Sequence, residues 1–165
     1  TQADLITIGP GSLYTTVIAC LLVNGIAQAI RDSPALCVYV ANTTTQPGQT
    51  DGLSLSTHVA EVMHYLGGDS LDYVLVNGSH LDDDLLVRYH ADGVYPLACT
   101  AEELARVESL GPRVIVSDFV ERAHKRDLWQ KQDSLRHSPA LVARALMQLV
   151  EERFLSGQNL GAQRP

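Results

Sequence analysis

The sequence lacks any run of apolar residues long enough to cross a membrane. A membrane-spanning helix needs about 20 predominantly apolar residues, so we expect no association with a membrane. The first residues also lack the basic flank and apolar stretch that mark a secretory signal. These two absences favour a protein that stays in the cytoplasm.

Cysteine is scarce and scattered. The three cysteines, Cys20, Cys37 and Cys99, lie far apart in apolar surroundings and show no spacing typical of a metal site. Such residues are usually small buried side chains of a reducing compartment. We therefore expect a cytoplasmic protein without a cysteine-bound zinc ion.

Basic residues are rare in residues 1–120, which hold four of them against fourteen acidic residues, whereas residues 121–165 hold eight against five. The net charge of the chain is −7. Because proteins that bind nucleic acid usually present a basic face, we expect no nucleic-acid partner. A phosphate ligand would be met mainly by backbone N–H groups, with arginine supplied from the last part of the chain.

Apolar runs alternate with helical patterns along the chain. The apolar runs predict strands at 4–8, 35–41, 72–77 and 113–119, and a short extended segment at 94–99. The periodic patterns predict helices at 12–22, 26–31, 54–66, 82–90, 100–108 and from 139 onward, and the charged stretch 121–133 predicts a loop. This alternation predicts an α/β domain with a mostly parallel sheet.

Three of these helices begin at residues suited to capping. Ser12 can cap the first helix, and Ser54 or Ser56 begins the third. Thr100 followed by Glu103 has the sequence pattern of a capping box.

The first candidate loop, IGPGSLYT, leaves the first predicted strand. Gly9 and Gly11 permit close approach to the backbone, and Ser12 lies at a helix N-terminus, whose free N–H groups suit phosphate. Ligands of open parallel sheets bind beyond the carboxyl ends of the strands. The same residues also describe an ordinary tight turn with a serine cap, so both interpretations stay open.

The second candidate loop, ANTTTQPGQTDGLS, spans residues 41–54 and is longer than most connections between a strand and a helix. It carries many more hydroxyl and amide groups than one helix cap requires. These groups suit sugar hydroxyls or the edge of a uracil or guanine base, and Asp51 suits a hydroxyl group or a metal ion. A solvated loop built on side-chain turns is the alternative, and we favour ligand binding.

Other polar residues give weaker signals. His58 faces either the cleft or solvent, and the acidic run 82–84 is explained by the first turn of a helix. Arg136 directly precedes the last helix, where a guanidinium can bind a pyrophosphate or carboxylate or form a surface ion pair. The histidines that show no partner pattern are expected at the surface: His64, His80, His90 and His124.

Three segments in this order resemble the carboxyl-terminal half of CofD-like proteins: ITIGPGSLYTTVIACLLVNGIAQAI, VYVANTTTQPGQTDGLSLSTHV and LRHSPALVARAL. The resemblance covers about residues 3–152 and is closer to the branch of YvcK-like gluconeogenesis factors than to the 2-phospho-L-lactate transferases. It implies a Rossmann-like, three-layer α/β fold. Residues 1–155 would then be the carboxyl-terminal portion of a nucleotide-binding domain, and residues 156–165 a flexible tail.

The resemblance also implies a function. The gluconeogenesis-factor branch binds UDP-sugars, notably UDP-N-acetylglucosamine, and supports growth on gluconeogenic carbon and control of cell shape. The transferase branch moves a phospholactyl group from a guanosine diphosphate carrier to a deazaflavin alcohol with Mg²⁺. We therefore expect a regulatory protein that binds a nucleotide-diphosphate sugar, with a Mg²⁺-dependent transferase as the alternative. Homodimerisation through apolar surface stays open.

The residues that the resemblance assigns to the ligand site are Gly9, Gly11, Ser12, Tyr14, Thr15, Asn42, Thr45, Gln46, Gly48, Thr50, Asp51, Gly52, Tyr89 and Arg136. In the transferase alternative, Asp51 would hold the Mg²⁺ ion. Gln49 replaces the usual acid of the second motif, which makes this alternative less favoured, and Ala19, Cys20 and Asn24 replace residues that affect packing. Family members begin with an upstream strand and glycine-rich loop, so we expect this chain to be part of a longer protein.

Overall fold

The computed structural model describes residues 2–81, 83–121 and 135–161. Its four strands form one parallel sheet in the order β1-β2-β3-β4. The strands are β1 (Leu5–Ile8), β2 (Leu36–Val40), β3 (Tyr73–Asn77) and β4 (Arg113–Ser117). Each predicted strand is confirmed within two residues of its expected ends, and all three pairings are parallel.

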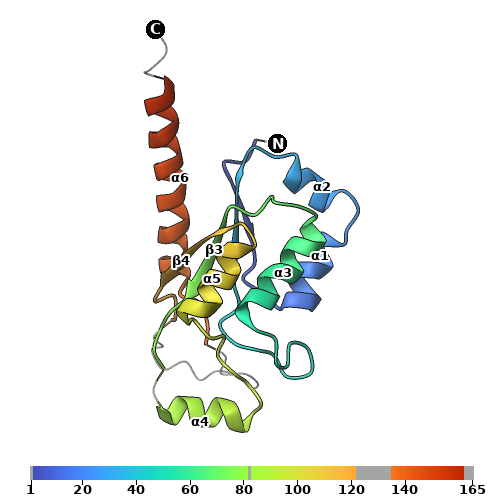
Figure 1. Ribbon diagram of the computed structural model, residues 1–165, viewed down its shortest axis with the longest axis vertical. Coiled ribbons are helices and arrows are strands. Elements are labelled where there is room, and N and C mark those ends of the chain that lie inside the picture. The colour runs from blue at the N-terminus through green and yellow to red at the C-terminus, as the bar shows by residue number, and fades with distance from the viewer. Residues whose placement is uncertain (1, 82, 122–134, 162–165) are drawn as a thin grey trace.

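Helices connect the successive strands (Figure 1), as parallel pairing requires. Between β1 and β2 lie the π-helical turn η1 (Leu13–Ile18), α1 (Ala19–Leu21) and α2 (Ile26–Arg31). The later helices are α3 (Leu55–Leu66), α4 (Asp83–Ala91), α5 (Ala101–Ser109) and α6 (Pro139–Gly161). Among these helices, none is long and apolar enough to cross a membrane.

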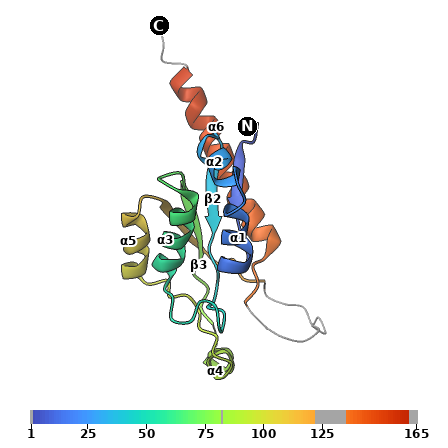
Figure 2. The same cartoon turned by 90° about the vertical axis from the view of Figure 1, so that its right-hand side faces the viewer.

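The two faces of the sheet are covered by different helices, which gives the expected three layers. Figure 2 shows α3 and α5 on one side of the sheet and α6 on the other. Along β2, Cys37 and Tyr39 pack into the core on the α3 side, whereas Leu36, Val38 and Val40 pack toward α6. All five residues of β2 are buried, because a central strand covered on both faces has no solvated side.

The first helix differs from its prediction. The N–H groups of Thr16 and Val17 both donate to Ser12 O, at 3.1 and 3.0 Å, so the segment begins as a π-turn. The side chain of Ser12 makes no cap hydrogen bond, and its hydroxyl instead donates to Gln46 Oε1. The predicted side-chain cap is therefore wrong for Ser12. The cap at Ser54 is confirmed, since its Oγ accepts from Thr57 N at 3.2 Å.

Only half of the predicted capping box forms at α5. Thr100 Oγ1 accepts from Glu103 N at 3.2 Å, as expected. The Glu103 carboxylate instead reaches another helix, where it accepts from Ser56 N at 3.0 Å. Glu103 is thus buried between α5 and the first turn of α3, which explains why a charged side chain lies inside the core.

The carboxyl-terminal helix is longer than the sequence suggests. Helix α6 continues to Gly161, whereas the sequence predicts a flexible tail from residue 156. Figure 1 shows that the end of α6 projects beyond the rest of the molecule. Most of the predicted loop at 121–133, together with His124, lies outside the described residues.

Candidate functional site

Two loops meet at the carboxyl-terminal ends of the strands. We call residues 9–12, after β1, the glycine loop, and residues 42–54, after β2, the polar loop. Ser12 Oγ donates to Gln46 Oε1 at 2.7 Å, and Asn42 Nδ2 donates to Gly11 O at 3.0 Å. The structure therefore brings the two candidate loops together, although η1, α1, α2 and β2 separate them in the sequence.

Backbone conformation and close packing within the protein account for the two glycines of the glycine loop. Gly9 has a φ of +77°, and a Cβ atom there would lie 3.0 Å from Val40 O of the neighbouring strand. A Cβ atom on Gly11 would lie 3.1 Å from the Thr16 side chain. Close packing explains both residues before any ligand is considered.

Much of the hydrogen-bonding capacity of the polar loop is used to hold its own shape. The fully buried Thr50 accepts from Gln46 N at 2.8 Å through Oγ1. Asp51 Oδ2 accepts from Gly48 N at 2.6 Å. Gly48 and Gly52 have φ values of +77° and +69°, which glycine adopts readily in turns.

Asn42 links the two loops to the core. Its Oδ1 accepts from the hydroxyl of the buried Tyr39 at 3.1 Å, while its Nδ2 donates to Gly11 O. Burial raises the pKa of the Tyr39 phenol, so this hydroxyl is a proton donor near neutral pH. Both ends of the Asn42 amide are thus engaged with the protein.

A second segment supports the polar loop from the side. Thr45 N donates to Tyr95 O at 2.7 Å, and Tyr95 N donates to Thr45 Oγ1 at 2.9 Å. An antiparallel bridge joins Thr44 to Pro96. The extended segment predicted at 94–99 therefore pairs with the loop.

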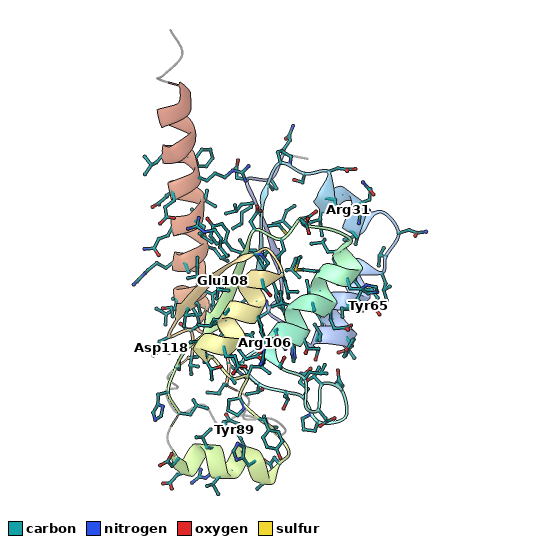
Figure 3. All side chains as sticks on the ribbon, viewed as in Figure 1. Arg31, Tyr65, Tyr89, Arg106, Glu108 and Asp118 are labelled. Carbon is teal, nitrogen blue, oxygen red and sulfur yellow. The ribbon has the colours of Figure 1, made fainter. Side chains whose placement is uncertain are left out.

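Tyr89 lies on α4, at the same end of the molecule as the polar loop (Figure 3). Its side chain is buried, and its carbonyl oxygen accepts from Val94 N at 2.8 Å. The pairing of residues 43–45 with residues 95–97 follows a few residues later. Tyr89 is thus placed near the loop through this neighbouring segment.

The segment before α6 also joins this edge of the sheet. Thr43 Oγ1 donates to Leu135 O at 2.6 Å, and Arg136 O accepts from Glu121 N at 2.8 Å. The side chain of His137 interacts with the backbone of Ala41, at the end of β2. These contacts place the exposed Arg136 beside the start of the polar loop.

Tyr14 and Thr15 are placed differently from the other predicted site residues. Tyr14 is half-buried and packs against the core on the α3 side. Burial, followed by the nearby Glu61 and Tyr65 of α3, raises the pKa of the Tyr14 phenol. Tyr14 thus lies toward α3, and Thr15 is exposed on η1.

Two histidines lie near this edge, and His58 is more buried than a surface position on a helix would be. His58 is fully buried, and its Nδ1 lies 2.8 Å from Ser54 O, which fixes Nδ1 as the protonated nitrogen. Burial lowers the pKa of His58 and of His137. Within the described part of the chain, neither Nε2 atom has a hydrogen-bond partner. His58 therefore faces neither solvent nor an open cleft.

Sequence reasoning placed Thr43 in the polar loop without a role of its own, and it gave no role in this region to Tyr39 or His137. Thr43 lies among other hydroxyl residues, and nothing in the sequence separates it from Thr44 or Thr45. Its partner, the carbonyl of Leu135, is 92 residues away along the chain. Only the folded arrangement reveals which hydroxyl makes the connection.

The predicted metal ligand, Asp51, offers limited coordination. One of its carboxylate oxygens accepts from Gly48 N. Among the residues that the structure describes, no group of three or more His, Cys, Asp or Glu side chains is arranged to hold a metal ion. Because Mg²⁺ is usually bound by one or two carboxylates together with phosphate oxygens, Asp51 fits an ion that a phosphate ligand brings with it.

These features define part of a parallel α/β domain. Two of its loops lie beyond the carboxyl ends of neighbouring strands, where open α/β sheets usually bind their ligands. A model of the family described as 2-phospho-L-lactate transferase CofD matches residues 1–120, and the chain belongs to this family.

Its similar relatives carry the name of a gluconeogenesis factor. A putative gluconeogenesis factor from Deinococcus radiodurans is 40% identical over 148 residues, which cover 90% of this chain and 28% of the relative. The gluconeogenesis factor from Halalkalibacterium halodurans is 36% identical over 147 residues, which cover 89% of this chain and 42% of the relative. The gluconeogenesis factor from Bacillus subtilis is 34% identical over 151 residues, which cover 92% and 44%.

A crystal structure of a protein from Bacillus halodurans matches with a TM-score of 0.76 and 37% sequence identity. The match covers 88% of this chain and 43% of that protein. The Rossmann-like fold is thus confirmed. The chain spans less than half the length of the relatives that it matches.

Proposed function

We propose that this chain forms part of the binding site for a nucleotide-diphosphate sugar similar to UDP-N-acetylglucosamine, within a cytoplasmic factor that regulates gluconeogenesis or cell shape. The observation that carries the proposal is the junction of the glycine loop, the polar loop and the Arg136 segment at one edge of the sheet. The names of the relatives support the regulatory role.

The hydrogen bonds divide the predicted residues into two groups. Asn42, Thr45 and Thr50 hold the polar loop in place, because their side chains already bond to the protein. Gln46 and Arg136 are better suited to contact the ligand. Gln46 Oε1 accepts from Ser12, which leaves the amide nitrogen to donate to a phosphate or carbonyl oxygen.

Arg136 would bind the diphosphate. Arg136 is an exposed residue whose backbone lies beside the start of the polar loop, and its guanidinium can donate two parallel hydrogen bonds to one phosphate group. Tyr89, whose side chain is buried, would support the segment that pairs with the polar loop. The upstream half of the longer protein would complete the site.

Calorimetric titration with UDP-N-acetylglucosamine tests this proposal, performed on this chain and on the longer parent protein. Arg136→Ala should weaken binding by about 1.5–3 kcal/mol, the usual contribution of a hydrogen bond to a charged group. Arg144→Ala is the matched control, because Arg144 is an exposed arginine of α6. Absence of binding to the parent by any uridine or guanosine diphosphate sugar would contradict the proposal.

The family match favours testing a second function, because its description names 2-phospho-L-lactate transferase. In that case the same loops would position a guanosine diphosphate carrier, and Asp51 would help to hold Mg²⁺. When Mg²⁺ is present, the parent protein should then transfer the phospholactyl group from the activated lactyl donor to the hydroxyl of a deazaflavin alcohol and release guanosine monophosphate. Failure of this release would reject the transferase and leave the binding proposal intact.

A further inference from the structure

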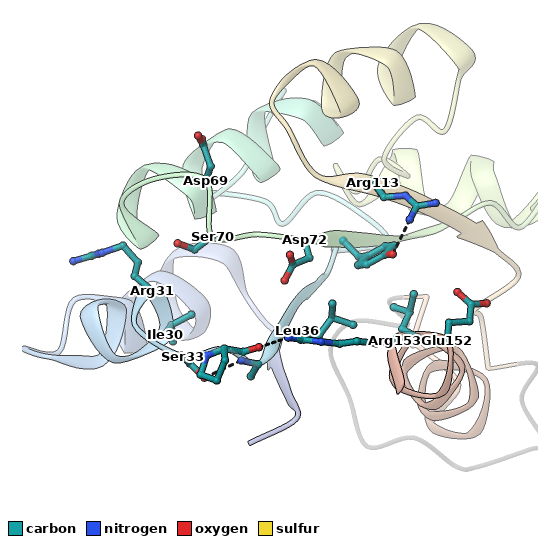
Figure 4. A pocket seen from close by; sticks show the side chains of 14 residues that line it. Ile30, Arg31, Ser33, Leu36, Asp69, Ser70, Asp72, Arg113, Glu152 and Arg153 are labelled. Atoms are coloured by element: carbon teal, nitrogen blue, oxygen red, sulfur yellow. Dashed lines mark hydrogen bonds between the residues drawn. The ribbon is translucent and has the colours of Figure 1, made fainter. Parts of the chain in front are cut away.

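A cavity of about 630 Å³ lies at the amino-terminal ends of the strands, whereas the polar loop lies at their carboxyl-terminal ends. Its lining includes Leu36, Tyr73 and Arg113, the first residues of β2, β3 and β4, whereas the polar loop follows the last residue of β2. The end of α2, the segments that lead into β2 and β3, and one side of α6 form the remaining walls (Figure 4). The volume is within the range of about 300–1,000 Å³ that is typical of small-molecule sites.

Three arginines from three different elements line this cavity, which we call the arginine cavity. Arg31 comes from the end of α2, Arg113 from the start of β4 and Arg153 from α6. Residues 1–120 contain only four basic residues, and two of them are at this cavity. Their gathering is therefore not a consequence of a generally basic surface.

Each of these arginines donates a hydrogen bond to an uncharged oxygen. Arg31 donates to Leu66 O, Arg113 donates to the Tyr73 hydroxyl at 2.9 Å, and Arg153 donates to Pro34 O. A carbonyl or phenol oxygen orients a guanidinium without neutralising its charge. Each arginine is thus positioned and still carries N–H groups that can bind an anion.

The surroundings restrict two of these side chains. Gly67 makes room for Arg31, since a Cβ atom at residue 67 would lie 2.8 Å from the Arg31 guanidinium. Arg113 lies over the ring of Tyr73, with its Cζ 5.3 Å from the ring centroid. Side chains that are already held in place lose less conformational entropy when a ligand binds.

Acidic and hydroxyl groups of the same cavity narrow the choice of ligand. Asp72 Oδ2 accepts from Cys37 N at 2.7 Å and so fastens the start of β3 to β2. Asp69 and Glu152 also belong to the lining, as do the hydroxyls of Ser33 and Ser70. The anionic groups of a hydroxylated anion would bind the arginines, and its hydroxyl groups would bind the carboxylates and serine hydroxyls.

We propose that the arginine cavity binds a small hydroxylated organic anion, either a polycarboxylate or a phosphate ester, through Arg113 and Arg153. This site is distinct from the proposed nucleotide-sugar site, because the two lie at opposite ends of the strands. Its ligand reaches α6 as well as the sheet, so binding would also fasten α6 to the domain.

Titration of the full chain with citrate and with glycerol phosphate, at constant ionic strength, tests the site and separates recognition of a hydroxylated carboxylate from recognition of a hydroxylated phosphate ester. We expect saturable binding of one anion per chain. Arg113→Gln and Arg153→Gln should each weaken it about tenfold or more, the loss of one hydrogen bond to a charged group. Arg144→Gln, an exposed α6 arginine outside the lining, should leave the affinity within about twofold.

Two further variants make the result decisive. Arg153→Lys keeps the charge but loses the planar fork, so it should fall between wild type and Arg153→Gln. Asp72→Asn removes a negative charge and should strengthen anion binding. Binding of neither anion in the millimolar range, or equal binding by wild type and both glutamine variants with unchanged melting temperatures, would overturn the proposal. Neither result would affect the titration with UDP-N-acetylglucosamine.

Discussion

The polar loop and the arginine cavity lie at opposite ends of the strands of one sheet. They differ in the groups to which their polar side chains bond. In the polar loop, Asn42 and Thr50 bond to the backbone that surrounds them. At the cavity, Arg113 and Arg153 bond to uncharged oxygens and keep their charge available. The partner of each polar group therefore tells more about ligand binding than the number of polar groups does.

The largest expected effect breaks the link between the two candidate loops. Asn42→Ala removes the partner of both the buried Tyr39 hydroxyl and Gly11 O. Leaving the buried Tyr39 hydroxyl and the partly buried Gly11 carbonyl unpaired should lower the free energy of unfolding by about 2–4 kcal/mol. Urea denaturation of the variant and the wild type measures this difference.

A double variant identifies the cause of that loss. Tyr39→Phe combined with Asn42→Ala removes one of the two unpaired groups, so it should be more stable than Asn42→Ala alone. If the second substitution adds its full cost instead, the Tyr39–Asn42 hydrogen bond does not contribute as inferred.

The next prediction tests whether buried side chains hold the polar loop in its shape. Thr50→Val keeps the shape of the fully buried side chain but leaves Gln46 N without its acceptor. We expect a loss of about 1–3 kcal/mol in the free energy of unfolding. Thr15→Val, on the exposed side of η1, should change it by less than about 0.5 kcal/mol. Equal effects of the two substitutions would show that the loop is a loosely held surface segment.

The fold was largely predictable from local patterns. The buried strand β2 has an uninterrupted apolar run, and the glycines and caps that bound α3 are visible in the sequence. The π-turn at η1 was not predictable, because a bond from Val17 N to Ser12 O differs from an α-helical bond by one residue. No local pattern distinguishes the two.

The candidate site was predictable only in part. The polar loop is recognisable because its hydroxyls and amides are consecutive in the sequence. The arginine cavity is not, because Arg31, Arg113 and Arg153 are brought together only by the order of strands and helices. The burial of His58 was also missed, since its bond to Ser54 O forms within one helical turn and leaves no mark in the composition.

The pH dependence of stability provides a smaller effect at the polar edge. Burial lowers the pKa of His58 below its ordinary value of 6.5. Below pH 6.5 the unfolded chain therefore takes up a proton that the folded chain does not, and the free energy of unfolding falls as the pH decreases. One such group changes it by at most about 1.4 kcal/mol per pH unit.

His58→Asn should flatten this dependence, because asparagine can still donate to Ser54 O and does not titrate. The lowered pKa of His137 contributes in the same direction and remains in the variant. Denaturation at several values between pH 5 and pH 7 measures the slope.

The smallest effect on stability separates the two roles open to Asp51. Asp51→Asn keeps an oxygen that can accept from Gly48 N, so the free energy of unfolding should change by less than about 0.5 kcal/mol. The same substitution removes the charge that a Mg²⁺ ion would need. If Mg²⁺ strengthens nucleotide-sugar binding in the wild type and not in this variant, Asp51 contributes to a metal site. If Mg²⁺ acts equally on both, the Asp51 carboxylate serves only to shape the loop, as its bond to Gly48 suggests.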